Sequence, residues 1–262
     1  MRICWIHPTT RNDTLAALWS KLDEVVRPTL HEGTEFEFRF LPRSGNFVRS
    51  LYAEHINSVH IVEAVLQAEQ DGFDGVFLGC WNDPLWEARE VVGIPVASVS
   101  EQSMLAALSM GKRFAVVTVS QKTSLAIEND LMAYGFRDRA IVRPVRSIMP
   151  ESDGDLLLGA VTDPFSDFVP RFEQVANECI RDGADVILVG CAYYGPLLRA
   201  AGYTEIPGTG VPVLDSSTVA LKYLEAMTDI ALRTGFVKST RLQLKPPPAE
   251  ALQRARQSLA LG

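Results

Sequence analysis

The sequence lacks the features of a membrane protein and of a nucleic-acid-binding protein. No apolar run in its 262 residues is long enough to cross a bilayer, and Met1–Pro8 is too short to be the apolar core of an export signal. Lysine and arginine form no cluster, and the net charge is −7, which argues against nucleic acid and anionic membranes as partners. We therefore expect a cytoplasmic protein that acts on a small molecule.

Cysteine is scarce, with four residues, no Cys-x-x-Cys pair and no histidine at ligand spacing. This pattern argues against a zinc site, and in a reducing cytoplasm the cysteines should be free thiols. A chain of this length can bury roughly 70–75% of the surface that its unfolded form exposes, so it needs neither a disulfide nor a metal to fold. The composition, 47% hydrophobic and 22% charged, is typical of a globular protein.

One ten-residue stretch occurs twice, as DGFDGVFLGC at 71–80 and as DGADVILVGC at 182–191. Five positions are identical, and the other five are apolar or glycine in both copies. Each copy predicts the end of a helix, a turn that contains glycine, a short apolar strand and then Gly-Cys.

Two further landmarks follow the same order in each half. The predicted strands 2–7 and 113–118 are 111 residues apart, as are the two Gly-Cys pairs, and Gly93–Val96 reappears as Gly210–Val213. This agreement indicates a duplicated half.

Alternating strands and helices predict an α/β fold with mostly parallel sheets covered by helices. Ligands bind such sheets beyond the carboxyl ends of the strands, and Cys80, Cys191, His7 and Thr118 lie at such ends. Two similar halves that face each other would bring these residues to one interdomain cleft. The predicted helices span about 14–26, 51–70, 101–110, 123–134, 170–181, 218–234 and 249–261.

Two cysteines at equivalent strand ends suit a proton transfer at a carbon next to a carbonyl. Removing a proton from one face and returning it to the other requires a base on each face, and a thiol that titrates near 8.5 can serve as base or acid. Asp83 as a helix N-cap and Pro84 as the first helical residue predict a helix start that lowers the pKa of the Cys80 thiol. Two thiolates would repel, so Cys80 and Cys191 should share one proton.

The alternative for a cysteine is a place in the core, because free cysteine is among the most buried residue types. We prefer that reading for Cys4, in the middle of a predicted strand, and for Cys179, in the middle of a predicted helix.

The candidates for substrate binding flank these strand ends. Thr118–Ser120 offers hydroxyl and backbone N–H groups for the oxygen of a carbanion, although turn and capping roles explain the same residues. His7 is either a donor to a substrate oxygen or a hydrogen-bonded loop residue. Trp81 and Tyr193 form either an aromatic pocket or a packed domain junction. The full set of substrate-binding candidates is His7, Thr9, Trp81, Asn82, Thr118, Val119, Ser120, Ala192 and Tyr193.

The chain resembles the aspartate/glutamate/hydantoin racemase superfamily, closest to the hydantoin and allantoin racemases. The residues that carry the resemblance are Gly79–Pro84, Ala88–Glu90, Ile94–Val96 and Val189–Cys191. The resemblance implies two pseudo-symmetric α/β domains, 1–97 plus 213–262 and 98–212, with the active site between them. It also implies racemisation without a cofactor by Cys80 and Cys191, with a substrate carboxylate or ring carbonyl held by the first-strand loop and by residues 118–120.

The chain departs from the usual hydantoin-racemase pattern at two places where substrate is expected to bind. His7–Thr10 stands where Asn-Pro-Asn-Thr is usual, and Ala192–Tyr194 replaces small residues. We expect a racemase of 5-substituted hydantoins or related amino-acid derivatives, assembled as a homo-oligomer. The alternatives are an isomerase or decarboxylase with one cysteine, similar to maleate isomerase or arylmalonate decarboxylase, and a non-catalytic small-molecule sensor. The presence of both cysteines argues against the decarboxylase.

Overall fold

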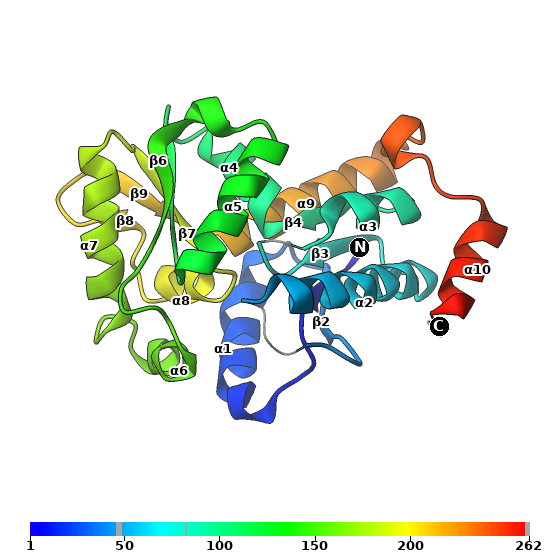
Figure 1. Cartoon of the computed structure of the whole chain (residues 1–262), viewed down its shortest axis with the longest axis horizontal. Coiled ribbons are helices and arrows are strands. Elements are labelled where there is room, and N and C mark those ends of the chain that lie inside the picture. The colour runs from blue at the N-terminus through cyan, green and yellow to red at the C-terminus, as the bar shows by residue number, and fades with distance from the viewer. Residues whose placement is uncertain (46–48, 82, 260–262) are drawn as a thin grey trace.

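The computed structural model describes residues 1–45, 49–81 and 83–259, which form two lobes, each built on its own sheet (Figure 1). The first sheet has the strand order β2-β1-β3-β4, and all of its strands are parallel. Its strands are β1 (Arg2–His7), β2 (Glu35–Phe40), β3 (Gly75–Leu78) and β4 (Val96–Ser98).

The second sheet repeats this order as β6-β5-β7-β9, with a short antiparallel strand, β8, added at the β9 edge. Its strands are β5 (Phe114–Thr118), β6 (Ala140–Ser147), β7 (Val186–Gly190), β8 (Glu205–Ile206) and β9 (Val211–Leu214). The repeated order confirms the predicted α/β fold with two similar halves. Strand β9 extends to Leu214, two residues beyond the domain boundary expected at residue 212.

Helices cover both sheets. They are α1 (Ala16–Val26), α2 (Leu51–Gln70), α3 (Leu85–Val91), α4 (Val99–Ala107), α5 (Gln121–Ala133), α6 (Gly154–Thr162), α7 (Phe168–Arg181), α8 (Tyr194–Ala200), α9 (Ser216–Thr234) and α10 (Ala249–Ser258). Short 3-10 turns occupy Asp13–Leu15, Arg27–Thr29, Arg137–Arg139 and Leu242–Leu244. In the described part of the chain, no helix combines the length and the apolar character that a membrane span requires.

Two helices cross between the lobes. Helix α4 follows β4 of the first sheet but contacts β7 of the second, whereas α9 follows β9 of the second sheet and contacts β3 and β4 of the first. The two helices also pack on each other, and they meet at the centre of the molecule in Figure 1. Because each lobe buries a helix that the other lobe supplies, their relative position is set by apolar packing.

Helix α1 makes a third connection. It packs on α6 and α8, and its buried side chains Leu18, Trp19 and Leu22 belong to the core of the second lobe. Arg199 of α8 adds polar contacts, since its Nη2 donates to Val25 O at 2.6 Å and its Nε donates to Asp215 Oδ2 at 2.9 Å. Asp215 also caps α9, accepting a hydrogen bond from Thr218 N. These contacts join α1, α8 and α9 across the junction.

The two Gly-Cys glycines lie where neighbouring strands approach closely. A Cβ on Gly79 would sit 1.9 Å from Trp5 Nε1, and a Cβ on Gly190 would sit 2.6 Å from Thr118 Cβ and 3.0 Å from Thr118 Cα. Only glycine fits without a shift of the adjacent strand, which explains why the residue precedes both cysteines.

Replacing one of these glycines tests the close approach. We expect Gly190→Ala to lower the free energy of unfolding by about 1–3 kcal/mol through overpacking against β5. Gly159→Ala is the matched control, because Gly159 lies inside α6 and nothing stands within 4 Å of its added Cβ. That control should gain about 0.5–1 kcal/mol from helix propensity. Urea denaturation measures both, and a Gly190→Ala protein as stable as the wild type would contradict the packing argument.

Candidate active site

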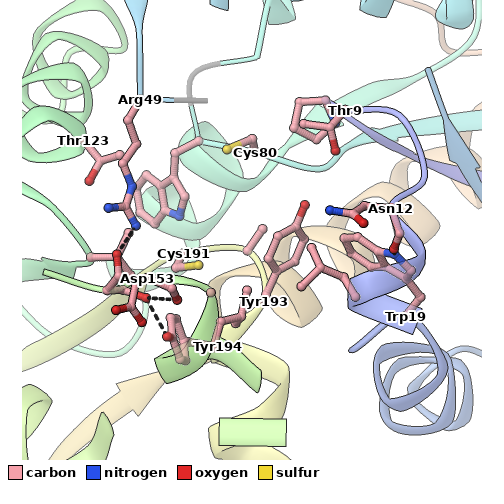
Figure 2. Close-up of a pocket in the computed structure, with 18 of the residues that line it drawn as sticks. Thr9, Asn12, Trp19, Arg49, Cys80, Thr123, Asp153, Cys191, Tyr193 and Tyr194 are labelled. Carbon is pink, nitrogen blue, oxygen red and sulfur yellow. Dashed lines mark hydrogen bonds between the residues drawn. The ribbon is translucent and has the colours of Figure 1, made fainter. Parts of the chain in front are cut away.

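A cavity of about 820 Å³ lies between the lobes and is lined by residues of both (Figure 2). Seven of the residues predicted from the sequence line it: Thr9, Cys80, Trp81, Val119, Cys191, Ala192 and Tyr193. A cavity of this size accommodates a small organic ligand. Within the residues that the structure describes, no group of three histidine, cysteine or acidic side chains could hold a metal ion.

Cys80 and Cys191 reach the cavity from opposite lobes. Cys80 lies just beyond β3 in the first sheet, and Cys191 directly follows β7 in the second. Figure 2 shows them entering the same space from different parts of the chain, and their charges influence each other. Both are partly exposed free thiols, whereas Cys4 and Cys179 are buried free thiols, as their predicted core roles require.

Burial dominates the electrostatics of both cavity thiols. It raises the pKa of Cys80 well above its ordinary value, and the nearby charges of Asp83 and Cys191 raise this pKa further. Burial also raises the pKa of Cys191, but the backbone N–H groups of Tyr194 and Tyr193 and the positive charge of Arg49 oppose it. The expectation that a helix start lowers the pKa of Cys80 is therefore wrong in its net direction, because desolvation outweighs the backbone N–H of Trp81 that opposes it.

Asp83 does not cap α3 as the sequence predicted. Its Oδ2 accepts a hydrogen bond from the backbone N–H of Cys80 at 2.8 Å, while Pro84 occupies the N-cap position without a side-chain bond. Burial raises the pKa of the Asp83 carboxyl to about 7. Asp83 thus fixes the backbone beside the Cys80 thiol and stays close to half protonated at neutral pH.

Three predicted substrate-binding residues do not line this cavity. Thr118 is buried, and its Oγ1 donates to Gly190 O at 2.6 Å. Ser120 is buried as the N-cap of α5, where its Oγ accepts from Thr123 N. Capping and strand contacts, the alternative for these hydroxyls, therefore account for both. Asn82, the remaining candidate, lies outside the described residues.

His7 is the third of these residues, and it is fully buried under the cavity in an aromatic cluster. Its ring stacks on Phe40 at 4.6 Å between centroids and on Trp5 at 5.4 Å. Neither ring nitrogen has a hydrogen-bond partner among the described residues, and burial lowers the pKa of His7 to about 3. The histidine therefore acts as a neutral aromatic ring.

Several lining residues were not predicted from the sequence. Arg49 donates from Nη2 to Ser152 O at 2.5 Å and so links the lobes beside the cavity. Trp19, predicted only as part of a helix, packs edge-on against Tyr193 with 5.4 Å between ring centroids. No local pattern signals these roles, because each contact joins parts of the chain that are distant in sequence.

Comparison with known proteins agrees with the site. The model of the Asp/Glu/Hydantoin racemase family matches residues 12–224. The chain therefore belongs to the Asp/Glu/hydantoin racemase family. It is an isomerase of the racemase class, the class that its family model and two of its curated relatives name.

Two of these relatives are hydantoin racemases. The protein of Pseudomonas sp. (strain NS671) is 27% identical over 212 residues, 79% of each chain, and that of Rhizobium meliloti is 30% identical over 177 residues, 67% of this chain and 68% of the relative. Among solved structures, the allantoin racemase from Klebsiella pneumoniae has a TM-score of 0.77 at 24% identity, over 99% of this chain and 98% of its own. The allantoin racemase of Pseudomonas fluorescens has a TM-score of 0.75 at 22% identity, over 94% and 97%. Both allantoin racemase structures have the same fold as this chain.

The raised thiol pKa values predict the pH dependence of alkylation. We expect slow reaction with iodoacetamide at pH 7, since both cavity thiols are protonated there, and faster reaction as the pH rises. Cys191 should react at lower pH than Cys80, because backbone N–H groups and Arg49 stabilise its thiolate. Peptide mapping by mass spectrometry between pH 6 and 10 measures each site, with buried Cys4 and Cys179 as internal controls. Preferential labelling of Cys80 at pH 7 would contradict this order.

The lowered pKa of His7 predicts an effect on stability. In the unfolded chain His7 takes up a proton below about pH 6.5, whereas the folded ring stays neutral down to about pH 3, so its protonation favours unfolding as the pH falls through that range. We expect His7→Phe to be more stable than the wild type, by an amount that grows between pH 6.5 and 4. Urea denaturation at several pH values measures the difference, and a constant difference would show that His7 is charged in the folded state.

Proposed function

We propose that this protein is a cofactor-independent racemase in which Cys80 and Cys191 exchange a proton with a carbon next to a carbonyl. The observation that carries the proposal is the arrival of two thiols from equivalent strand ends at one cavity. A substrate held between them has one thiol for each face of its stereocentre, as inversion by proton transfer requires.

The unequal surroundings of the thiols suggest how a turnover begins. Cys191 loses its proton more readily, so its thiolate removes the substrate proton while the Cys80 thiol donates a proton to the opposite face. The other enantiomer uses the same pair in reversed roles. One negative charge passes from sulfur to substrate and back to sulfur, which avoids two thiolates in the same cavity.

The intermediate carries negative charge on its carbonyl oxygen, and the cavity offers a donor for it. Burial raises the pKa of Tyr193 well above its ordinary value, so its hydroxyl keeps its proton at neutral pH. A single well-placed donor contributes about 3–4 kcal/mol to such a transition state. Tyr193, which lines the cavity, takes the role first expected of Thr118 and Ser120.

A 5-substituted hydantoin or a related amino-acid derivative is the proposed substrate class. Two curated relatives are hydantoin racemases, and two of the matching structures are allantoin racemases. The rings of Trp19, Trp81 and Tyr193 line the cavity and suit a planar heterocycle with an apolar substituent.

Racemisation in D₂O tests the function directly. The wild type should remove the circular dichroism of each enantiomer of 5-benzylhydantoin and place deuterium at the stereocentre. We expect Cys80→Ser to lose solvent exchange with one enantiomer and Cys191→Ser with the other, and each variant to racemise at least 10²-fold more slowly. Cys179→Ala is the control, because that thiol is buried in α7 away from the cavity.

Other outcomes favour the alternatives. Normal racemisation by both serine variants rules out the two-cysteine mechanism. If only one cysteine is needed and a covalent adduct forms, the protein is the single-cysteine isomerase. If only one cysteine is needed and an arylmalonate loses CO₂, the protein is the decarboxylase. Binding without turnover, retained in the double serine variant, indicates the sensor.

A further inference from the structure

A second, much smaller cavity lies beside Cys80. Its volume is about 20 Å³, enough for one water molecule. Five polar or ionisable residues, Cys80, Asp83, Glu54, Asn57 and Ser58, line it together with Pro8 and Ile61. Cys80 and Glu54 also line the large cavity, so the two spaces lie side by side.

Asn57, one of the lining residues, has a buried donor without a protein partner in the described part of the chain. The residue is 2% exposed, and its Oδ1 accepts a hydrogen bond from Gly45 N at 2.7 Å, which fixes the orientation of the amide. Its Nδ2 then has no hydrogen-bond partner among the described residues. A buried amide that leaves its donors without a partner is destabilising unless another polar group accepts them. A water in the small cavity would be such a group.

Asp83 ties this space to the chemistry of the large cavity. Its carboxyl accepts the backbone N–H of Cys80 at 2.8 Å and borders the same small cavity as the Cys80 side chain. The negative charge of Glu54 on α2 raises the pKa of Asp83. The charge of Asp83 in turn raises the pKa values of Cys80, Asp130 on α5 and Tyr193.

We propose that Asp83 and the small cavity form a proton route that resets Cys80 between turnovers. The inference rests on the proposed two-cysteine racemisation. After Cys80 has given its proton to the substrate, its sulfur is a thiolate, and Cys191 carries the proton that it removed. The Asp83 O–H bond then breaks as the Cys80 S–H bond forms. The Asp83 carboxylate recovers a proton through the small cavity and Glu54, and Cys191 releases its proton to solvent in the large cavity.

The different charges around the two cysteines explain why Cys80 needs a proton donor and Cys191 does not. Backbone N–H groups favour the thiolate of both cysteines, but the positive charge of Arg49 helps Cys191 to release a proton, whereas the charges of Asp83 and Glu54 disfavour the Cys80 thiolate. Burial raises the pKa of the Asp83 carboxyl to about 7, so both its protonated and its ionised form are present near neutral pH, as a proton relay requires.

The decisive variant is Asp83→Asn, which keeps an acceptor for the N–H of Cys80 but cannot carry a proton. With 5-benzylhydantoin we expect kcat to fall at least tenfold while kcat/KM changes less than threefold, because resetting follows product release. In the wild type, kcat should fall as the pH rises through about 7, since protonated Asp83 is the donor, and the variant should lack this fall. Asp130→Asn is the matched control. Asp130 is another buried carboxyl whose pKa burial raises to about 7, but it does not line either cavity.

The possible results separate this inference from the proposed function. A wild type that does not racemise any hydantoin refutes the function itself. A racemase whose Asp83→Asn variant keeps its kcat, or loses kcat and kcat/KM equally, refutes the relay alone, since equal losses indicate only a misplaced Cys80. If Asp83→Asn does not fold, Glu54→Gln replaces it. A several-fold lower kcat at constant kcat/KM supports the relay in that variant, and an unchanged kcat overturns it.

Discussion

The exchange of helices between the lobes is the packing constraint on which the site depends. Helices α4 and α9 each leave one sheet and bury their side chains against the other, and α1 adds a third contact. Each thiol extends from a strand end of its own lobe, so no local interaction sets the space between them. That space is set by the apolar interface at the centre of the molecule, which resists small displacements because protein interiors are close-packed.

Enclosure by the two lobes also determines the acidity of the site. Burial raises the pKa of Cys80, Cys191 and Asp83, and it keeps the hydroxyl of Tyr193 protonated. The charges of Asp83 and Glu54 near Cys80 and of Arg49 near Cys191 then make the two thiols unequal, although the strands that carry them are equivalent. A duplicated fold therefore holds two cysteines with different surroundings.

The sequence repeat was enough to predict the two cysteines of the candidate site. It was not enough to predict which neighbouring side chains point into the cavity. Cys80 and Cys191 stood out because both end a repeated strand. Thr118 ends β5 and Ser120 lies two residues later. A hydroxyl there either faces a ligand or bonds to the nearby backbone, and here both bond to the protein. Rotation about χ1 decides whether such a hydroxyl faces the ligand or the backbone. The sequence pattern is the same for both orientations, so it does not distinguish them.

The sequence by itself determined the two parallel sheets, the duplication, the cysteines at strand ends and the resemblance to the racemase family. These features arise from local patterns of apolar residues, turns and glycines, which a linear reading detects. Only the tertiary structure decided that Arg49 bonds Ser152, that Asp83 binds the Cys80 backbone and that His7 is buried in an aromatic cluster. It also decided the net direction of the thiol pKa shifts. Each of these depends on burial or on the orientation of a side chain in three dimensions, and desolvation follows from the whole fold rather than from neighbours in the chain.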